Sequence, residues 1–370
     1  MTVATRIQLI SIQHRTDHRT QQAAECHDSE LHSLELLKGR YPDRFEGIVH
    51  VRQDGTLYAN SWKGNRTYQV EPSQQKETEE ESLALLLESL KAIPHNSGEH
   101  IKKRLWKNTS TIIHQRPEFE SLELRALGDL LSTYLREDWF NIVDLSGHGG
   151  KDWIAGMRLT MVDQGFGIAQ QRRGIKPKAI SLNGCETALV TNLLRLSNRT
   201  PFIIATGQSM GGFPLTEMLE SILDSPHYGD EAAVIRMARS THQLEGVNAI
   251  AINTEHVASL ASRYQTLLET LRKELDHEVL LDIIHSAIRA SRTAHRLGGD
   301  QEDRKVKSVM GDFGKFVKVL IRSNISPAVK KAAEETLQIL EKAVVAKGIC
   351  SDPDFIGLPF NAQKMFMLFP

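Results

Sequence analysis

Two short stretches of this 370-residue chain carry residue types that can catalyse acyl transfer. Cys185 follows the apolar run "AISLN" after a single glycine, and His148 stands in "VDLSGHGG", which closes another apolar run. A thiolate is a strong nucleophile, and it forms near neutral pH when a histidine lies close to the sulfur. The pair predicts nucleophilic catalysis, with Cys185 as the nucleophile and His148 as its base.

The glycines around both residues suit the same chemistry. Gly149 and Gly150 leave backbone N–H groups beside the histidine unobstructed, where they can donate to an oxyanion. A tight turn at Gly184 brings the thiol to the start of "CETALVTNLLRLS", which we expect to be a helix. The N-terminus of a helix favours negative charge, so it would stabilise the thiolate of Cys185.

A second nucleophile competes with the cysteine. The run Gly207-Gln208-Ser209-Met210-Gly211 matches G-x-S-x-G, the elbow of serine hydrolases, and "SGHGG" has the composition of their oxyanion loop. An elbow places a helix directly after the serine, whereas Pro214 suits the first position of a later helix, "PLTEMLESIL". A serine esterase remains an alternative, and so does a catalytically inactive interaction module.

Strands and helices alternate around these motifs. Strands with apolar residues at nearly every position predict a mostly parallel sheet covered on both faces, and such sheets carry their functional groups at the carboxyl ends of strands. His148, Cys185 and Ser209 each follow such an end. We expect strands at 140–146, 177–183 and 201–207, and helices at 118–138, 159–174 and 185–197.

The patterns on either side of these motifs divide the chain into two predicted regions. We expect the first, 1–245, to be the α/β domain and the second, 246–370, to be mainly helical and packed on it. The expected elements of the first are a strand at 6–12, a helix at 28–41 capped by Asp28 or Ser29, a hairpin about "DG" at 54–55, a solvated acidic run at 71–82 and a helix at 82–93. Those of the second are a strand at 248–252, helices at 254–275, 277–295 and 326–346, and a strand-like end at 355–370.

Composition narrows the class of partner. Apolar residues make up 40% of the chain, charged residues 25%, and the net charge is −1, so charge gives no case for a nucleic-acid or membrane partner. The N-terminus lacks the pattern of a signal peptide, and Cys26, Cys185 and Cys350 suit free thiols in a reducing compartment. We expect a cytoplasmic protein, with delivery by a dedicated secretion system left open. We expect surface positions for His14 and His18, and no metal site.

The stretches "FNIVDLSGHGG" and "KAISLNGCETA" resemble the clostripain-like cysteine peptidases, in the clan of caspases, gingipains and legumain. That pattern is an apolar block ending in H-G, then a second ending two residues before the catalytic cysteine. "FIIATGQSMGGFPLTEMLESIL" is similar to the family's substrate loop, and "GDFGKFVKVLI" to its aspartate-aromatic helix start. The resemblance implies a caspase-like α/β/α sandwich with a mainly helical C-terminal region.

The resemblance also implies roles for individual residues. His148 and Cys185 form the dyad, the amides of Gly149 and Cys185 bind the oxyanion, and a peptide is cleaved through an acyl-enzyme intermediate. Asn183, Gln208 and Ser209 fall at substrate-binding positions. The family commonly has acids at the first two of these, which select arginine or lysine at P1. Asn183 and Gln208 are amides, so we expect a neutral polar P1 residue or a weakened basic preference.

Members of that family often mature by self-cleavage near the active site. The candidate processing sites here are Lys151, Arg172, Arg173 and Lys176, and "QQRRGIKPK" has the polar composition of an exposed loop. An amide-lined pocket predicts activation of a zymogen in trans, by another protease or a regulatory protein. Some relatives require calcium, but the chain has no loop with oxygen ligands at calcium-binding spacing, so we predict no cofactor.

Overall fold

The computed structural model describes the chain in separate stretches. The described residues are 5–15, 21–53, 56–63, 66–69, 117–147, 149, 152–185, 187–207, 212–224, 229–241, 249–276, 278–280, 282–283, 286, 310–347 and 356–361. The predicted acidic run at 71–82 and helix at 82–93 lie outside them.

Strands and helices alternate through the first part of the chain, as expected. The elements of this part are β1 (Ile7–Arg15), α1 (Gln21–Arg40), β2 (Phe45–Gln53), β3 (Thr56–Lys63), β4 (Arg66–Gln69), α4 (Pro117–Tyr134), β5 (Phe140–Ser146), β6 (Trp153–Ile154), β7 (Met157–Arg158), α5 (Leu159–Arg173), β8 (Ala179–Asn183), α6 (Val190–Leu196), β9 (Phe202–Ala205), α7 (Leu215–Leu223) and α8 (Asp230–Ser240). The remaining elements are β10 (Ile250–Asn253), the 3-10 helix η2 (Thr254–His256), α9 (Val257–Glu274), β11 (Met310–Asp312), α11 (Phe313–Arg322), α12 (Pro327–Ala343), β12 (Val344–Lys347) and β13 (Pro359–Asn361).

One nine-stranded sheet crosses the molecule in the order β12-β10-β9-β8-β5-β1-β2-β3-β4. Its centre is parallel, because β9, β8, β5, β1 and β2 all run the same way. Antiparallel strands complete both edges: β10 and β12 on one side, β3 and β4 on the other. The parallel centre confirms the α/β prediction and gathers the carboxyl ends of β5, β8 and β9 at one edge.

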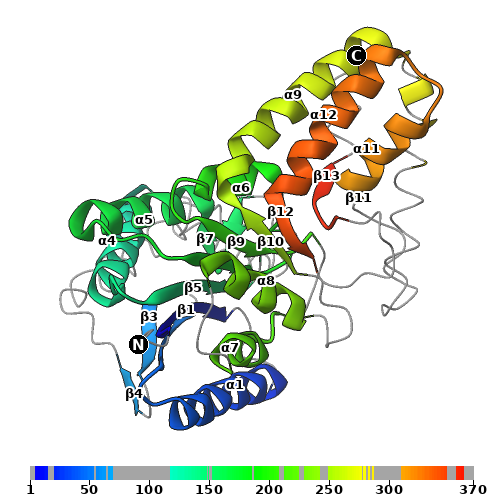
Figure 1. The fold of residues 1–370 in the computed structure, drawn as a ribbon. Coiled ribbons are helices and arrows are strands. Elements are labelled where there is room, and N and C mark those ends of the chain that lie inside the picture. Colours follow the sequence, from blue (N-terminus) through cyan, green and yellow to red (C-terminus); the bar gives the residue numbers. More distant parts are fainter. Residues whose placement is uncertain are drawn as a thin grey trace.

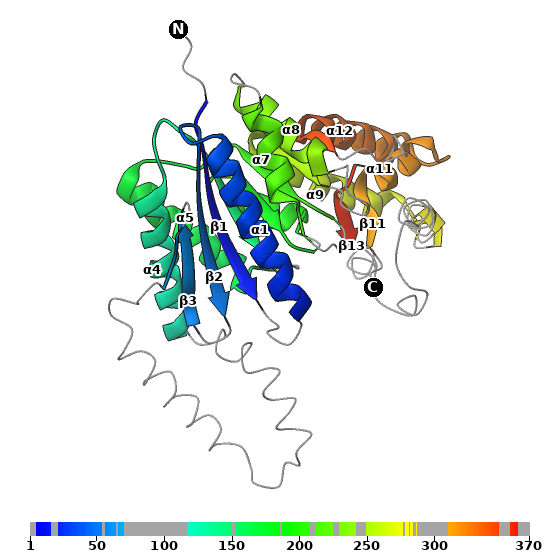
Figure 2. The ribbon, with the colours of Figure 1, turned by 90° about the horizontal axis from the view of Figure 1, so that it is seen from below.

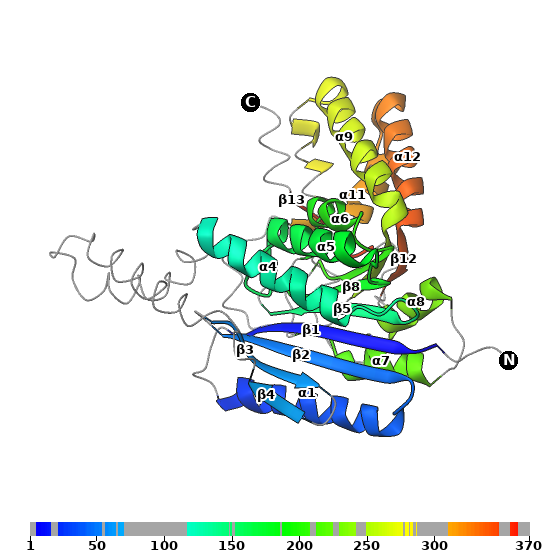
Figure 3. The ribbon, with the colours of Figure 1, turned by 90° about the vertical axis from the view of Figure 1, so that its left-hand side faces the viewer.

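Helices cover both faces of this sheet, as its apolar strands require (Figure 3). One face carries Ile10, Val143 and Ile180 and packs on α4, α5, α6 and α9. The other carries Leu9 and Ile142 and packs on α1, α7 and α8. Figure 2 shows α1 lying along β1 and β2, with α7 beside it and α8 beyond α7. Among the described helices, none has the length and hydrophobicity that crossing a membrane requires.

The C-terminal part contributes to the sheet as well as to the helical layer. Its helices α9, α11 and α12 lie together at one end of the molecule (Figure 1), while β10 and β12 extend the main sheet. In the described part of the closing stretch, 356–361, β13 pairs with β11 in a separate antiparallel pair and not with that sheet. The domain boundary near residue 245 stays a prediction.

Several predicted elements are confirmed, and others need correction. The central strands and the β2–β3 hairpin are where the sequence places them. Helix α1 begins at Gln21, so Asp28 and Ser29 lie inside it and do not cap it. Helix α12 ends at Ala343, and the β-branched run that follows forms β12 where we expected more helix. Helix α6 begins only at Val190, well after Cys185.

Candidate active site

The site is built where β5 and β8 end side by side. These strands are parallel neighbours with Ser146 opposite Asn183. The pairing continues one step further, since the amide of Gly147 donates to the Asn183 carbonyl at 3.1 Å. The residues that follow β5 and those that follow β8 therefore leave the sheet together.

Glycines let these two turns touch backbone to backbone. A Cβ on Gly149 would lie 2.7 Å from the Cys185 carbonyl oxygen and 2.9 Å from its nitrogen. A Cβ on Gly184 would lie 2.7 Å from the Gly147 carbonyl oxygen and 3.0 Å from Gly149 Cα. Any side chain at 149 or 184 would separate the turns. The two motifs singled out in the sequence are thus in direct contact.

His148 and Gly150 lie outside the described residues, as do Lys151, Gln208 and Ser209. The neighbours of the histidine, Gly147 and Gly149, are both described and both lie against the turn that holds the cysteine. The geometry between His148 and Cys185 therefore stays a prediction, and so does the oxyanion role of the Gly149 and Cys185 amides.

Cys185 is half-buried in the turn directly after β8. The prediction that it heads a helix is wrong, because residues 187–189 are not helical and α6 starts at Val190. Thr187 holds the intervening chain in another conformation: its hydroxyl donates to the Leu182 carbonyl at 2.9 Å and accepts from the Thr206 amide at 3.3 Å. The N-terminus of α6 therefore does not lie at Cys185, as the predicted dipole effect on its thiolate required.

A short hairpin that the sequence did not reveal supports the turn after β5. Strands β6 and β7 are joined at Ala155 and Gly156, whose φ angles of 51° and 71° are typical of a type I′ turn. Ile154 forms a bridge with Gly149 and reaches Gly184 with its side chain. His14 is half-buried against Gly156, so its predicted surface position is wrong.

Asn183 lies at the end of β8 with only 3% of its surface exposed. Its Oδ1 accepts the backbone N–H of Phe213 at 2.6 Å. This bond ties β8 to the turn before α7. Whether Asn183 also contacts substrate stays a prediction.

A buried acid lies beside Asn183. Asp144 of β5 is fully buried, and burial raises its pKa to about 6. Hydrogen bonds from Ser181 at 2.7 Å and Ser11 at 2.9 Å, and one with the Asn183 side chain, oppose that rise. The only sequence signal for this group was an acid inside an apolar strand just before the histidine motif.

Helix α7 begins later than a serine elbow requires. Pro214 caps α7, and the helix begins at Leu215, so it does not start directly after Ser209. This agrees with the delay expected from the sequence, although the helix begins one residue later than the predicted first position.

The candidate processing residues fall in two settings. Arg172 and Arg173 belong to the last turn of α5, where Arg172 pairs with Asp129. The helix predicted at 159–174 is therefore confirmed, and the loop interpretation of 170–178 is wrong for residues 170–173. Helix α5 stops at Gly174, whose φ of 69° suits a glycine cap. Lys176 is exposed in the coil that follows.

In the part of the chain that the structure describes, no cluster of three or more histidine, cysteine, aspartate or glutamate side chains is suited to a metal ion.

Solved structures resemble this arrangement over almost the whole chain. An inactive zymogen C11 protease from Parabacteroides distasonis matches at a TM-score of 0.59, with 11% identity over 100% of this chain and 96% of its own. A secreted C11 cysteine protease from Bacteroides thetaiotaomicron matches at a TM-score of 0.56, with 11% identity over 97% and 94%. This chain has the fold of the C11 cysteine proteases. No protein-family model matches the sequence, and no curated protein does either.

The C11 fold agrees with the architecture that the clostripain-like resemblance implies. At 11% identity the likeness concerns the fold, so the activity has to be argued from the site itself. Within the C11 fold, the two motifs stand at the ends of adjacent parallel strands, the edge where such sheets carry functional groups.

Proposed function

We propose that this protein is a cysteine endopeptidase that cleaves polypeptides at Cys185. The observation that carries the proposal is the backbone contact between Gly149 and the Gly184–Cys185 turn. This contact joins the histidine motif to the cysteine motif across two strand ends. A lone half-buried cysteine at a strand end would not support the same conclusion.

In the proposed reaction, His148 accepts the thiol proton and the Cys185 thiolate attacks the scissile carbonyl carbon. Backbone N–H groups of Gly149 and Cys185 donate to the oxyanion. The C–N bond then breaks as His148 protonates the leaving amine, which leaves an acyl-enzyme. Water hydrolyses this thioester and restores the free thiol.

For substrate selection we propose a P1 residue without a positive charge. Asn183 and Gln208 supply amides where a basic-specific relative would supply carboxylates, so an arginine or lysine side chain would be desolvated without a counter-charge. In this proposal Ser209, which the resemblance also assigns to substrate binding, adds a hydroxyl to the P1 site. A panel of peptides with Arg, Asn, Asp or Leu at P1 tests this, and exclusive cleavage after arginine or lysine would refute it.

We further propose that the chain is made as a zymogen and is cut in trans. Among the candidate sites, the Arg173–Gly174 bond follows the last helical residue of α5. Cleavage after Lys176 would have to precede Pro177, which lacks an N–H group. Lys151 remains a candidate. An amide-lined P1 site fits none of these basic residues, so purified protein incubated alone should keep its intact mass.

The compartment is part of the proposal as well. A nucleophilic thiol must stay reduced to react, so we propose a cytoplasmic site of action. The Bacteroides thetaiotaomicron protein of the same fold is described as secreted.

Two matched variants test the reaction. Cys185→Ala should abolish hydrolysis of peptide substrates. Ser209→Ala should retain a substantial part of this activity. Both variants should also be assayed on ester substrates. Loss of ester hydrolysis only in Ser209→Ala would favour a serine esterase, and activity unchanged in both variants would contradict any role for either nucleophile.

A further inference from the structure

The C-terminal segment 356–359 packs directly against the first residue of the stretch that carries Gln208 and Ser209. A Cβ on Gly207 would lie 2.5 Å from the Gly357 carbonyl oxygen and 2.9 Å from Pro359 Cδ, distances that real Cβ atoms essentially never show. Gly357 has a φ of 88°, which favours glycine as well. Two backbones far apart in sequence therefore touch with no side chain between them.

Asp312 fixes the C-terminal side of this contact. Its side chain caps α11 by accepting the Lys315 amide at 2.9 Å. The same carboxylate accepts the Gly357 amide at 2.6 Å and the Ile356 amide at 3.2 Å. Only 3% of Asp312 is exposed, so water does not compete freely for these bonds.

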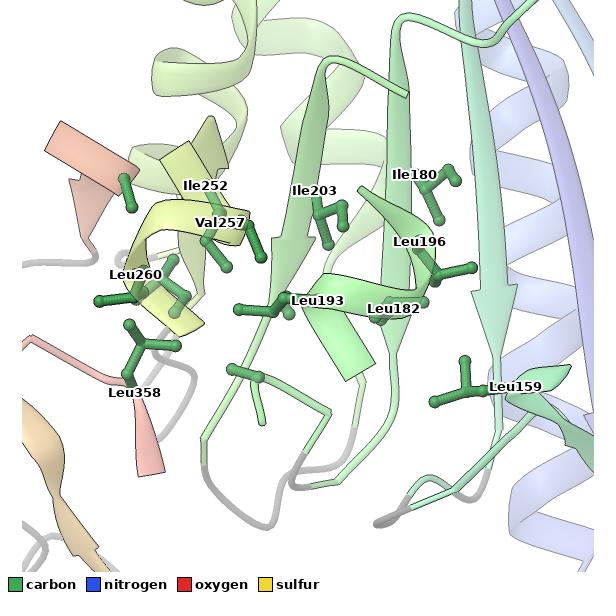
Figure 4. Close-up of a cluster of buried hydrophobic side chains, with 14 of the residues drawn as sticks. Leu159, Ile180, Leu182, Leu193, Leu196, Ile203, Ile252, Val257, Leu260 and Leu358 are labelled. Atoms are coloured by element: carbon green, nitrogen blue, oxygen red, sulfur yellow. The ribbon is translucent and has the colours of Figure 1, made fainter. Parts of the chain in front are cut away.

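Core packing holds the same segment from other directions. Leu358 is fully buried and lies beside Leu260 of α9 (Figure 4), and its carbonyl accepts the Phe313 amide at 2.7 Å. Strand pairing then sets Pro359 opposite Asp312. The start of α11 and residues 356–361 are thus joined by hydrogen bonds into one support for Gly207.

We infer that Asp312 is a positioning residue for the substrate side of the site. It holds 356–357, these residues hold Gly207, and Gly207 leads into Gln208 and Ser209. The far end of the same stretch is held independently, through the bond from Phe213 to Asn183. The C-terminal region is therefore part of the substrate-binding apparatus. This inference rests on the proposed function, because it assumes that Gln208 and Ser209 contact substrate.

The test compares two helix caps in the full chain. Asp312→Ala removes the cap that also holds Gly357, whereas Ser326→Ala removes the cap of α12, where the Ser326 hydroxyl accepts the Val329 amide at 3.3 Å. Both should lower the thermal midpoint. Only Asp312→Ala should lower kcat/KM for peptides, by about 10- to 100-fold and mainly through KM. A small displacement of substrate-positioning residues reduces kcat/KM by factors of this size.

A second readout separates positioning from general damage. Alkylation of Cys185 by iodoacetamide needs no substrate pocket, so its rate should stay within about twofold in Asp312→Ala. If Asp312→Ala does not fold, Gly207→Ala disturbs the same contact from the other side and should cause the same loss of kcat/KM. Asp312→Asn, which keeps one acceptor oxygen, should fall between Asp312→Ala and the parent.

The outcomes are distinguishable. If the parent protein cleaves no peptide through Cys185, the proposed function is contradicted, and this inference is contradicted with it. If the parent protein is active and the Asp312→Ala and Gly207→Ala variants have the same kcat/KM as the Ser326→Ala control, this inference alone is overturned. The inference is also overturned if the alkylation rate of Cys185 in Asp312→Ala falls by the same factor as its kcat/KM, because Asp312 would then act on the whole site.

Discussion

At the scale of single residues, the candidate site depends on two positions that have no side chain. Gly149 and Gly184 have no side chains, and this lets the turn after β5 rest on the backbone of Cys185. The sequence predicted these glycines as oxyanion and turn residues. It did not reveal their packing, because that depends on which strands are neighbours in the sheet.

Gly184→Ala tests this contact. The added methyl would lie 2.6 Å from Ile154 Cδ1 and 2.7 Å from the Gly147 carbonyl oxygen, so the turns must move apart. We expect peptidase activity to fall by about 100-fold, measured as kcat/KM. Gly39→Ala is the control, because nothing lies within 4 Å of its new methyl group. It should keep full activity, and an active Gly184→Ala variant would contradict the contact.

At the scale of elements, helix boundaries were the least predictable feature. The sequence after Cys185 favours a helix locally, yet residues 187–189 are not helical and α6 begins at Val190, because Thr187 bonds with Leu182 and Thr206. The end of α5 was predictable by contrast, because the helix expected at 159–174 matches Leu159–Arg173 and its cap at Gly174. The partners of Thr187 are distant in sequence, whereas the glycine that ends α5 follows it directly.

Limited proteolysis tests the end of α5. Residues within a helix resist cleavage, so a brief trypsin treatment should cut the segment 152–185 first after Arg173, where α5 ends. Intact-mass analysis should then find a fragment that begins at Gly174. Arg173→Gln should remove this fragment and keep the others. An equally early cut after Arg172 would mean that the last turn of α5 is not formed in solution.

At the scale of the whole molecule, the alternation of strands and helices was enough to predict a parallel α/β sheet. The outermost strands, β12 and β4, were not foreseeable in the same way. Strand β12 pairs with β10 only because α9, α11 and α12 return the chain to the sheet edge. The contact of Gly207 with Gly357 depends on the same return. Local patterns carry no information about such pairings.

Two buried groups predict how the stability of the whole molecule depends on pH. Burial raises the pKa of Asp144 from 3.8 to about 6, so the folded chain holds this proton more tightly than the unfolded chain. Its contribution to stability is fully present below about pH 4 and is lost as the pH rises through 6. Asp144→Asn should therefore gain stability relative to the parent over this range, on the order of 3 kcal/mol. Urea unfolding from pH 4 to 7.5 measures this, and a constant difference would contradict it.

His50 of β2 should act in the opposite direction. Burial lowers its pKa from 6.5 to about 4, so the unfolded chain binds the proton more tightly. Its contribution is fully present above pH 6.5 and is lost as the pH falls through 4. Relative to the parent, His50→Gln should gain on the order of 3 kcal/mol as the pH falls across that window. The same urea series measures it, and a gain on raising the pH would refute the assignment.

The central claim is that Cys185 is the nucleophile. A peptidyl chloromethyl ketone with a neutral P1 residue should alkylate the protein once, and peptide mapping by mass spectrometry should place the adduct on Cys185. The adduct should persist in Ser209→Ala, disappear in Cys185→Ala and form far more slowly in His148→Ala. An adduct on Ser209, or labelling of Cys185 no faster than that of an unfolded thiol, would contradict the account.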